Sequence, residues 1–156
     1  MPQVLVYSDD PAFRDAIRLA VGRRPSPDVE RVEFVDAPTG EALLAAVDEG
    51  GIDVVVIDGE ARPTGGFGLA KQLKDELKDC PPVLLLVARR DDTWLASWSL
   101  ADAVLPLPVD APATLEAVVT LLKHRADALP VRRAAALEQS CPAGRSCSLR
   151  CSAVSR

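Results

Sequence analysis

Short apolar runs alternate with amphipathic stretches over the first 124 residues of the chain. Compact apolar runs predict buried strands at residues 4–7, 54–57, 83–87 and 103–105. A further strand, nearer a sheet edge, is predicted where Val32 and Phe34 alternate with charged residues. The run at 54–57 is β-branched and lacks polar alternation, as in a central parallel strand covered on both faces. We therefore expect five strands.

Helical spacing of apolar residues follows each predicted strand. Asp10 and Pro11 predict the start of the first helix, and Thr39 predicts the cap of the second, which stops at Gly50. Five helices are predicted, and the fourth is a short segment at 91–100. The apolar stripes of the other four are Phe13, Ile17, Ala20 and Val21; Leu43, Leu44 and Val47; Leu69, Leu73 and Leu77; and Leu115, Val118, Val119 and Leu122. Strand and helix alternating five times predict right-handed crossovers. The expected fold class is α/β, a doubly wound five-stranded parallel sheet of the flavodoxin-like kind.

The periodic pattern fails after residue 124, which bounds the predicted domain at 1–124. Residues 125–133 are interpreted as the natural C-terminal end, and no second folded domain is expected in 156 residues. Residues 134–156 begin with Ala-Ala-Ala-Leu-Glu, resemble translated vector sequence, and are expected to be disordered. The alternative is a natural disordered tail with redox-active cysteines. A metal site there is not expected, because Cys141, Cys147 and Cys151 lack the paired C-x-x-C spacing.

Charge and hydropathy exclude two classes of partner. The net charge is −5, and it becomes −7 without residues 134–156, whose three arginines outweigh one glutamate by two. A surface that binds phosphates needs the opposite sign, so no nucleic-acid partner is expected. No apolar run approaches the roughly 18 residues that span a bilayer. We expect no membrane association and a cytoplasmic protein.

Acidic residues follow two of the predicted strands. Asp9 and Asp10 come after the first strand and Asp58 ends the third. Ligands of doubly wound sheets gather at the carboxyl ends of the strands, where these carboxylates would repel one another unless a hard cation such as Mg²⁺ bound between them. The alternative is that the aspartates end strands and cap helices. We favour the role of helix cap for Asp10 and the role of a ligand-binding carboxylate for Asp58.

Residues 3–124 resemble a receiver domain of the CheY-like response-regulator family. The likeness lies in residues 4–11, in residues 54–58, in Gly66 eight positions after Asp58, and in residues 105–108, where the family has a Lys-Pro pair. The resemblance implies that Asp58 is the phosphoacceptor. It also implies that Asp9, Asp58 and the backbone carbonyl of Glu60 bind Mg²⁺, with Asp10 as a further member of the acidic pocket.

Four positions depart from the family pattern. Ser8 replaces the first acid of the usual pair, although a one-residue shift of the alignment would restore a pair. Val87 replaces the hydroxyl residue, Val104 the aromatic switch residue and Leu107 the lysine. Without that ammonium and that hydroxyl, the sequence shows no obvious structural element that a change of charge at Asp58 could switch between two conformations. The usual coupling mechanism is therefore not expected.

Trp94 and Trp98 lie one helical turn apart in the predicted short helix. Such a pair more often belongs to the core. The alternative is an anchor for a partner, because Trp is enriched at interface hot spots.

Three functions remain open at this point. The first is a stand-alone, non-enzymatic receiver that acts through protein–protein contact, with a sensor histidine kinase or another signalling protein as partner and a homodimer also open. The second is a pseudo-receiver that binds its partner without phosphorylation. The third, a small flavodoxin-like or phosphotransfer enzyme, is disfavoured because no Gly-rich phosphate loop follows the first strand. Abundant Ala, Arg and Asp, with few Lys, indicate a high-GC and specifically actinobacterial source.

Overall fold

The computed structural model describes residues 1–63, 65–89 and 93–127. Strands and helices alternate as β1 (Gln3–Tyr7), α1 (Pro11–Val21), β2 (Glu33–Ala37), α2 (Gly40–Glu49), β3 (Ile52–Asp58), α3 (Gly66–Glu76), β4 (Val83–Val87), α4 (Thr93–Trp98) and β5 (Ala103–Pro106). A C-terminal helix follows over residues 111–127. Within these described ranges, no helix is long and apolar enough to cross a membrane. The segment 134–156, interpreted as vector-derived, lies outside the described residues.

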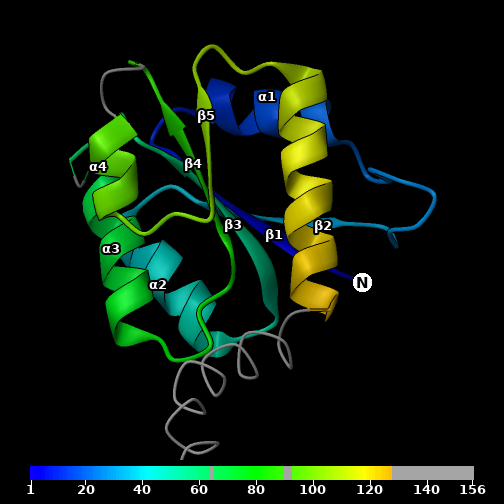
Figure 1. Ribbon diagram of the computed structural model, residues 1–156, viewed down its shortest axis with the longest axis horizontal. Coiled ribbons are helices and arrows are strands. Elements are labelled where there is room, and N and C mark those ends of the chain that lie inside the picture. The colour runs from blue at the N-terminus through cyan, green and yellow to red at the C-terminus, as the bar shows by residue number, and fades with distance from the viewer. Residues whose placement is uncertain (64, 90–92, 128–156) are drawn as a thin grey trace, which may run out of the picture. The chain divides into compact units, whose positions relative to one another are not determined.

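All five strands are parallel and stand in the order β2-β1-β3-β4-β5 (Figure 1). The predicted fold class is confirmed. The order of connection reverses between β1 and β3, which are neighbours. Tyr7, the last residue of β1, is in register with Ile57, the residue before the end of β3. Residues that follow β1 and residues that end β3 therefore meet at the same edge of the sheet.

Two apolar clusters cover the two faces of the sheet, because successive strand residues point to opposite sides. On one face Leu5, Val55 and Leu85 pack with Leu43 of α2 and Leu73 of α3. On the other face, residues such as Val6, Val56 and Leu86 pack with Ile17 of α1 and Val118 of the C-terminal helix. Figure 1 shows α2, α3 and α4 on one side of the sheet, with α1 and the yellow C-terminal helix on the other. Residues Met1–Arg125 form one compact unit.

The predicted edge strand begins later than the sequence pattern indicates. Val32 is buried but precedes β2, and its N–H donates to the carbonyl of Arg23 at 2.9 Å instead of to a neighbouring strand. Pairing with β1 starts at Glu33, which is in register with Gln3. Val32 is thus buried in a loop that folds back. The alternation of apolar and charged residues does not distinguish such a loop residue from a residue of the strand.

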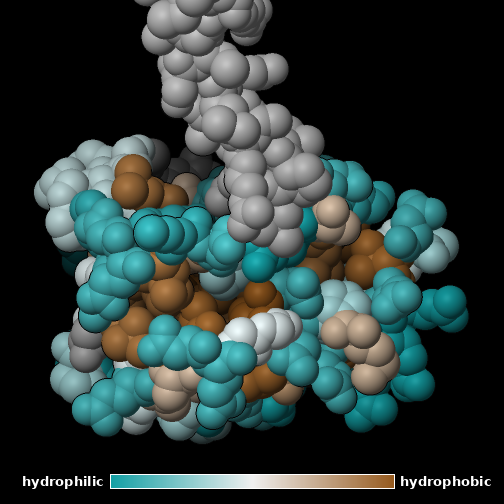
Figure 2. Space-filling model, turned by 90° about the horizontal axis from the view of Figure 1, so that it is seen from below, coloured by the Kyte–Doolittle hydropathy of each residue, from teal (hydrophilic) through white to brown (hydrophobic). Residues whose placement is uncertain are grey.

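The face at which the strands begin carries a cavity of about 270 Å³. Its lining combines apolar residues with two acids and an arginine: Val47, Asp48, Gly50, Gly51, Ile52, Leu77, Asp79, Pro81 and Arg125. Figure 2 looks onto this side of the molecule and shows hydrophobic residues surrounded by hydrophilic ones. Since Ile52 begins β3 and Asp58 ends it, this cavity is separate from the acidic edge of the sheet.

Candidate functional site

Asp58 lies at the carboxyl end of β3, where its side chain is held by two donors. The residue is 6% exposed. Its Oδ2 accepts a hydrogen bond from the hydroxyl of Ser8 at 2.9 Å, and its Oδ1 accepts one from the backbone N–H of Glu60 at 3.0 Å. Each carboxylate oxygen therefore already has a protein donor, and neither donor is charged.

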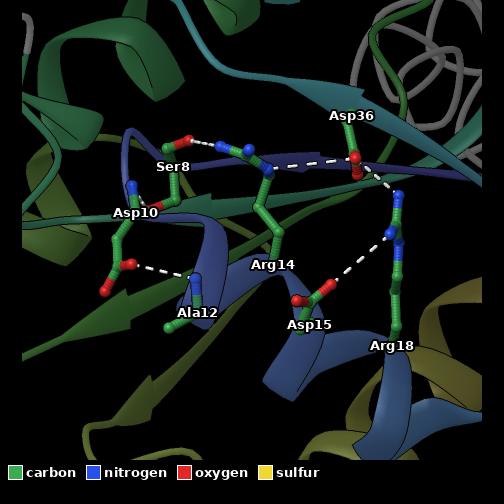
Figure 3. A network of polar contacts seen from close by, with 7 residues as sticks. All are labelled: Ser8, Asp10, Ala12, Arg14, Asp15, Arg18 and Asp36. Atoms are coloured by element: carbon green, nitrogen blue, oxygen red, sulfur yellow. Dashed lines mark hydrogen bonds and ion pairs between the residues drawn. The ribbon is translucent and has the colours of Figure 1, made fainter.

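Ser8 follows β1 and is completely buried. Its hydroxyl oxygen accepts from the backbone N–H of Asp10 at 3.1 Å, and its carbonyl accepts from Nη1 of Arg14 at 2.6 Å (Figure 3). Its own N–H donates to the carbonyl of Ala37 at 3.3 Å. Because the backbone is fixed on both sides and the hydroxyl oxygen already accepts one bond, the hydroxyl proton is directed to Asp58.

An ion-pair network clamps α1 against the ends of β1 and β2. The side chain of Arg14 is 16% exposed, and its Nε lies 3.9 Å from Oδ2 of Asp36 on β2. Arg18, one turn further along α1, places Nη2 2.5 Å from the same oxygen and pairs with Asp15 at 3.5 Å (Figure 3). Arg14 thus links the carbonyl of Ser8 to β2.

The two aspartates after β1 have different roles. Asp10 caps α1, since its Oδ1 accepts from the backbone N–H of Ala12 at 2.9 Å. This is the capping role favoured from the sequence. Asp9 is exposed, and its Oδ1 accepts from the backbone N–H of Arg62 at 3.3 Å. The loop after β3 therefore binds both Asp9, through Arg62, and Asp58, through Glu60.

Tyr7, the last residue of β1, reports on the charge of this edge. Burial raises the pKa of the Tyr7 phenol, and the negative charges of Asp9 and Asp58 raise it further. Asp9 follows β1 and Asp58 ends β3, so both carboxylates lie at the same end of these strands and raise the pKa of the same buried phenol.

The three positions where the family has its switch groups are apolar, and two of them, Val87 and Leu107, belong to separate parts of the core. Val87 is 3% exposed and packs in the cluster on the α2 and α3 face. Leu107 is partly buried and packs against the cluster on the opposite face. Val104 on β5 is 36% exposed. The two apolar replacements extend the two cores and supply neither the lysine nor the hydroxyl that would hold a phosphoryl group.

A hard cation fits this edge poorly. Among the residues that the structure describes, no group of three or more His, Cys, Asp or Glu is placed to hold a metal ion. Ser8 stands where a second acid would neighbour Asp9, and its hydroxyl proton occupies Oδ2 of Asp58. Mg²⁺ prefers several oxygen ligands in a near-octahedral set. Oδ1 of Asp9 and both carboxylate oxygens of Asp58 instead each accept one bond from an N–H or O–H donor.

Trp94 and Trp98 are exposed, so their interpretation as core residues is wrong. Trp94 is 67% exposed and Trp98 is 51% exposed. Two aromatic residues one turn apart have the same spacing on a buried and on an exposed face, and α4 is only six residues long. Nζ of Lys71 on α3 lies 6.0 Å from the ring centre of Trp98.

Three residues of the site were not predicted from the sequence. In the sequence, Ser8 was recognised as the replacement of an acid, but not as a hydrogen-bond donor to Asp58. Arg14 and Tyr7 were not singled out. A serine directly after a buried strand, beside aspartates, is the signal that could have suggested a hydroxyl–carboxylate pair. The role of Arg14 depends on the packing of α1 and has no local signal.

Comparison with known proteins identifies close relatives. No protein-family model matches the sequence. Two response regulatory proteins of Mycobacterium tuberculosis, from strains CDC 1551 and H37Rv, are each 50% identical over 121 residues, which is 78% of this chain and 91% of theirs. These mycobacterial relatives agree with the expected actinobacterial source.

Solved structures show the same fold. The receiver domain of the Francisella response regulator 1452 is 24% identical, with a TM-score of 0.68 over 80% of this chain and 98% of its own. The response regulator TrrA of Thermotoga maritima, solved in complex with Mg²⁺ and beryllofluoride, is 26% identical. Its TM-score is 0.64 over 78% of this chain and 100% of its own.

Proposed function

This chain belongs to the receiver domains of response regulators, and from that premise we propose that it signals through protein–protein contact without needing a phosphoryl group on Asp58. Family membership places it in two-component signal transduction. A partner would recognise the surface of the unphosphorylated receiver, in the conformation that the receiver's own residues stabilise. It includes a non-enzymatic role and the cytoplasmic location expected from the sequence.

The observation that carries the proposal is the hydrogen bond from Ser8 to Asp58. In a phosphorylatable site, the acceptor carboxylate needs cationic groups beside it to neutralise the incoming phosphoryl group. Here one oxygen accepts the Ser8 hydroxyl, the other accepts the Glu60 N–H, and Leu107 replaces the cationic lysine. A hydroxyl donor satisfies a buried carboxylate without adding charge, so the pair stabilises one resting conformation.

The partner side of the proposal follows from the exposed residues. A sensor histidine kinase or another signalling protein remains the expected class of partner, and a homodimer is an alternative. Trp94 and Trp98 are the proposed contact residues, because exposed indoles bury large apolar area on binding. Phosphorylation would not be required to expose them, since both are already at the surface.

A second candidate function keeps Asp58 as a weak phosphoacceptor. In this version Asp9, Asp58 and the carbonyl of Glu60 would be the ligands of Mg²⁺, with Asp10 outside the ligand set because it caps α1. Its support is that the charges of Asp9 and Asp58 act together on Tyr7. The Mg²⁺–beryllofluoride complex of the Thermotoga relative shows that a receiver of similar fold accepts this phosphoryl mimic.

A titration of the full chain with Mg²⁺ and beryllofluoride distinguishes the two functions. The fluorescence of the two tryptophans and the amide NMR shifts of Ser8 and Glu60 would be followed, with a well-dispersed spectrum confirming that the chain is folded. We expect no saturable change. A saturable, Mg²⁺-dependent shift that disappears in Asp58→Asn would overturn the proposal and support the weak acceptor.

A further inference from the structure

The loop between α1 and β2, residues 22–32, is fixed by contacts of its own. The backbone N–H of Val32 donates to the carbonyl of Arg23 at 2.9 Å, which joins the two ends of the loop. Val29 and Val32 are buried in the same apolar cluster as the core residues of α1. The loop also contains two prolines, which restrict its backbone: Pro25 and Pro27. These contacts reduce the conformational freedom that the loop would lose on binding a partner.

Three arginines of this loop have no charged partner. Arg23 and Arg24 follow α1, Arg31 precedes β2, and all three are exposed. The bond between Arg23 and Val32 brings Arg31, the neighbour of Val32, close to the other end of the loop. Among the residues that the structure describes, none of the three guanidinium groups forms an ion pair or a side-chain hydrogen bond. The three groups are therefore available to an anion from outside.

The acids of the same segment leave these arginines a net positive charge. Asp28 lies 3.5 Å from Nζ of Lys123 on the C-terminal helix, and Glu30 lies 3.5 Å from the amino group of Met1. Both acids are therefore placed beside cations outside the loop. Glu33, the exposed first residue of β2, offsets one of the three arginine charges and leaves two.

The loop lies at the end of the sheet opposite Asp58. It leads into the start of β2, whereas Asp58 ends β3, and the strands of the sheet are parallel. Figure 1 shows this blue loop projecting beyond β2, on the opposite side of the molecule from α4. A ligand of the loop would therefore occupy a surface separate from the acidic edge and from the tryptophans of α4.

The charge of the rest of the chain limits the size of the ligand. Residues 1–133 carry a net charge of −7, so the arginines stand on a chain that is otherwise acidic. A long polyanion such as RNA would extend beyond the loop and be repelled there. A short acidic segment of a protein can place a few carboxylates on the loop alone. Guanidinium groups suit this ligand, because each can bind a carboxylate through two parallel hydrogen bonds.

We propose that Arg23, Arg24 and Arg31 bind a short acidic segment of a partner protein, with Asp or Glu side chains paired to the guanidinium groups. The inference rests on the proposed function, in which the receiver signals through protein–protein contact, and it assigns the chemistry of one part of that contact. The loop is held by its own backbone bond and buried valines, so it presents the arginines without a phosphoryl group on Asp58.

Peptide selection tests the proposal without knowledge of the natural partner. A random dodecapeptide library displayed on phage is depleted on the Arg23→Gln/Arg24→Gln/Arg31→Gln variant and then selected on the full wild-type chain. We expect peptides enriched in Asp and Glu. A synthetic consensus peptide should bind more weakly as salt is raised. Calorimetry should give a loss of about two- to fivefold for each single Arg→Gln substitution, and of about tenfold or more for the triple variant.

Arg89→Gln is the matched control, because Arg89 is exposed, follows β4 at the other end of the sheet, and loses the same charge. Several results would overturn the proposal: no enrichment of acidic residues, equal binding to the triple variant, or an equal loss in Arg89→Gln. So would tighter binding of a twelve-nucleotide single-stranded RNA, which would make nucleic acid the ligand. Self-association in sedimentation equilibrium that is lost in the triple variant would also overturn it, since the ligand would then be a second copy.

Mg²⁺ and beryllofluoride separate this inference from the proposed function. We expect the affinity for the consensus peptide to be unchanged when both are added. A changed affinity, with the arginine variants still weakened, would contradict the phosphorylation-independent function and leave the loop as the binding surface. Binding that is independent of the arginines would overturn the inference and leave the proposed function standing.

Discussion

The backbone N–H of Leu107 donates to the carbonyl of Val87 at 2.7 Å. The two residues that replace the lysine and the hydroxyl of the family are thus hydrogen-bonded neighbours, Val87 at the end of β4 and Leu107 directly after β5. Their side chains nevertheless pack in clusters on opposite faces of the sheet. One substitution therefore cannot rebuild the switch, because the missing groups come from both sides of the sheet and from Ser8 after β1.

The combined variant Ser8→Asp/Val87→Thr/Leu107→Lys should gain a response that the wild type lacks. It restores an acid pair with Asp9, a hydroxyl and an ammonium around Asp58, the groups that would hold a cation and a phosphoryl mimic. We expect a saturable, Mg²⁺-dependent fluorescence change with beryllofluoride, and no change in Leu107→Lys alone. Adding Asp58→Asn to the combined variant is the control. A response that survives this addition would show that binding occurs elsewhere.

Ser8→Ala should destabilise the fold. The substitution removes the donor to Oδ2 of Asp58 and the acceptor for the N–H of Asp10 at a buried position, a change that costs about 1–3 kcal/mol. Urea unfolding followed by tryptophan fluorescence measures it. Ser26→Ala is the matched control, because the Ser26 hydroxyl accepts a similar N–H bond from Asp28 but in an exposed turn. Equal effects of the two substitutions would mean that the Ser8–Asp58 bond contributes little.

Two glycines of α3 should respond in opposite directions to the same added methyl group. A Cβ on Gly66 would overlap the carbonyl oxygen of Asp58 and lie 2.7 Å from Cγ2 of Ile57, so Gly66→Ala should cost about 1–3 kcal/mol by overpacking. Around Gly68 nothing lies within 4 Å, and Gly68→Ala should stabilise the helix by roughly 0.5–1 kcal/mol. Thermal unfolding of both variants checks this. A neutral Gly66→Ala would show that α3 can move away from the end of β3.

The pH titration of Tyr7 should report the charges of Asp9 and Asp58. Tyr7 is the one tyrosine of the chain, so tyrosinate absorbance near 295 nm follows it directly. Since burial raises its pKa first and the two carboxylates raise it further, Asp9→Asn and Asp58→Asn should each lower the midpoint. Asp10→Asn is the control, as Asp10 is not among the causes and asparagine retains the cap. An unchanged midpoint in Asp58→Asn would place that charge away from the phenol.

The same shift has a consequence for stability, with a defined sign. The folded chain holds the Tyr7 phenol protonated to higher pH than the unfolded chain does. The corresponding stabilisation is complete below the ordinary pKa of tyrosine, 10.0, and is lost as the pH rises through the higher folded value. Urea midpoints should therefore fall more steeply above pH 10 in the wild type than in Tyr7→Phe.

The strands and most helix boundaries were predictable because their determinants are local. Val54, Val55 and Val56 form an uninterrupted β-branched run, and such a run has few alternatives to a buried parallel strand. The cap of α1 was predictable for the same reason, since Asp10 acts on an N–H two residues away.

The contacts of the site depend on residues far apart in the sequence. Ser8 and Asp58 are fifty positions apart and meet only through the register of β1 with β3. The exposure of Trp94 was not predictable, because apolar spacing shows which residues share a side of a helix and not whether another element covers that side. Leu107 could be recognised as a departure from the family, but its packing partners required the fold.

The edges of the sheet decide whether the chain can pair with other copies strand to strand. At β5, the N–H of Leu107 points to β4, so the nitrogen of the preceding Pro106 points outward and carries no hydrogen. That strand is four residues long, and the opposite edge strand, β2, carries the acids Glu33 and Asp36. Short, proline-bearing or charged edges resist the addition of a foreign strand. The chain should accordingly withstand edge-to-edge aggregation even though the three inner strands, β1, β3 and β4, are mostly apolar.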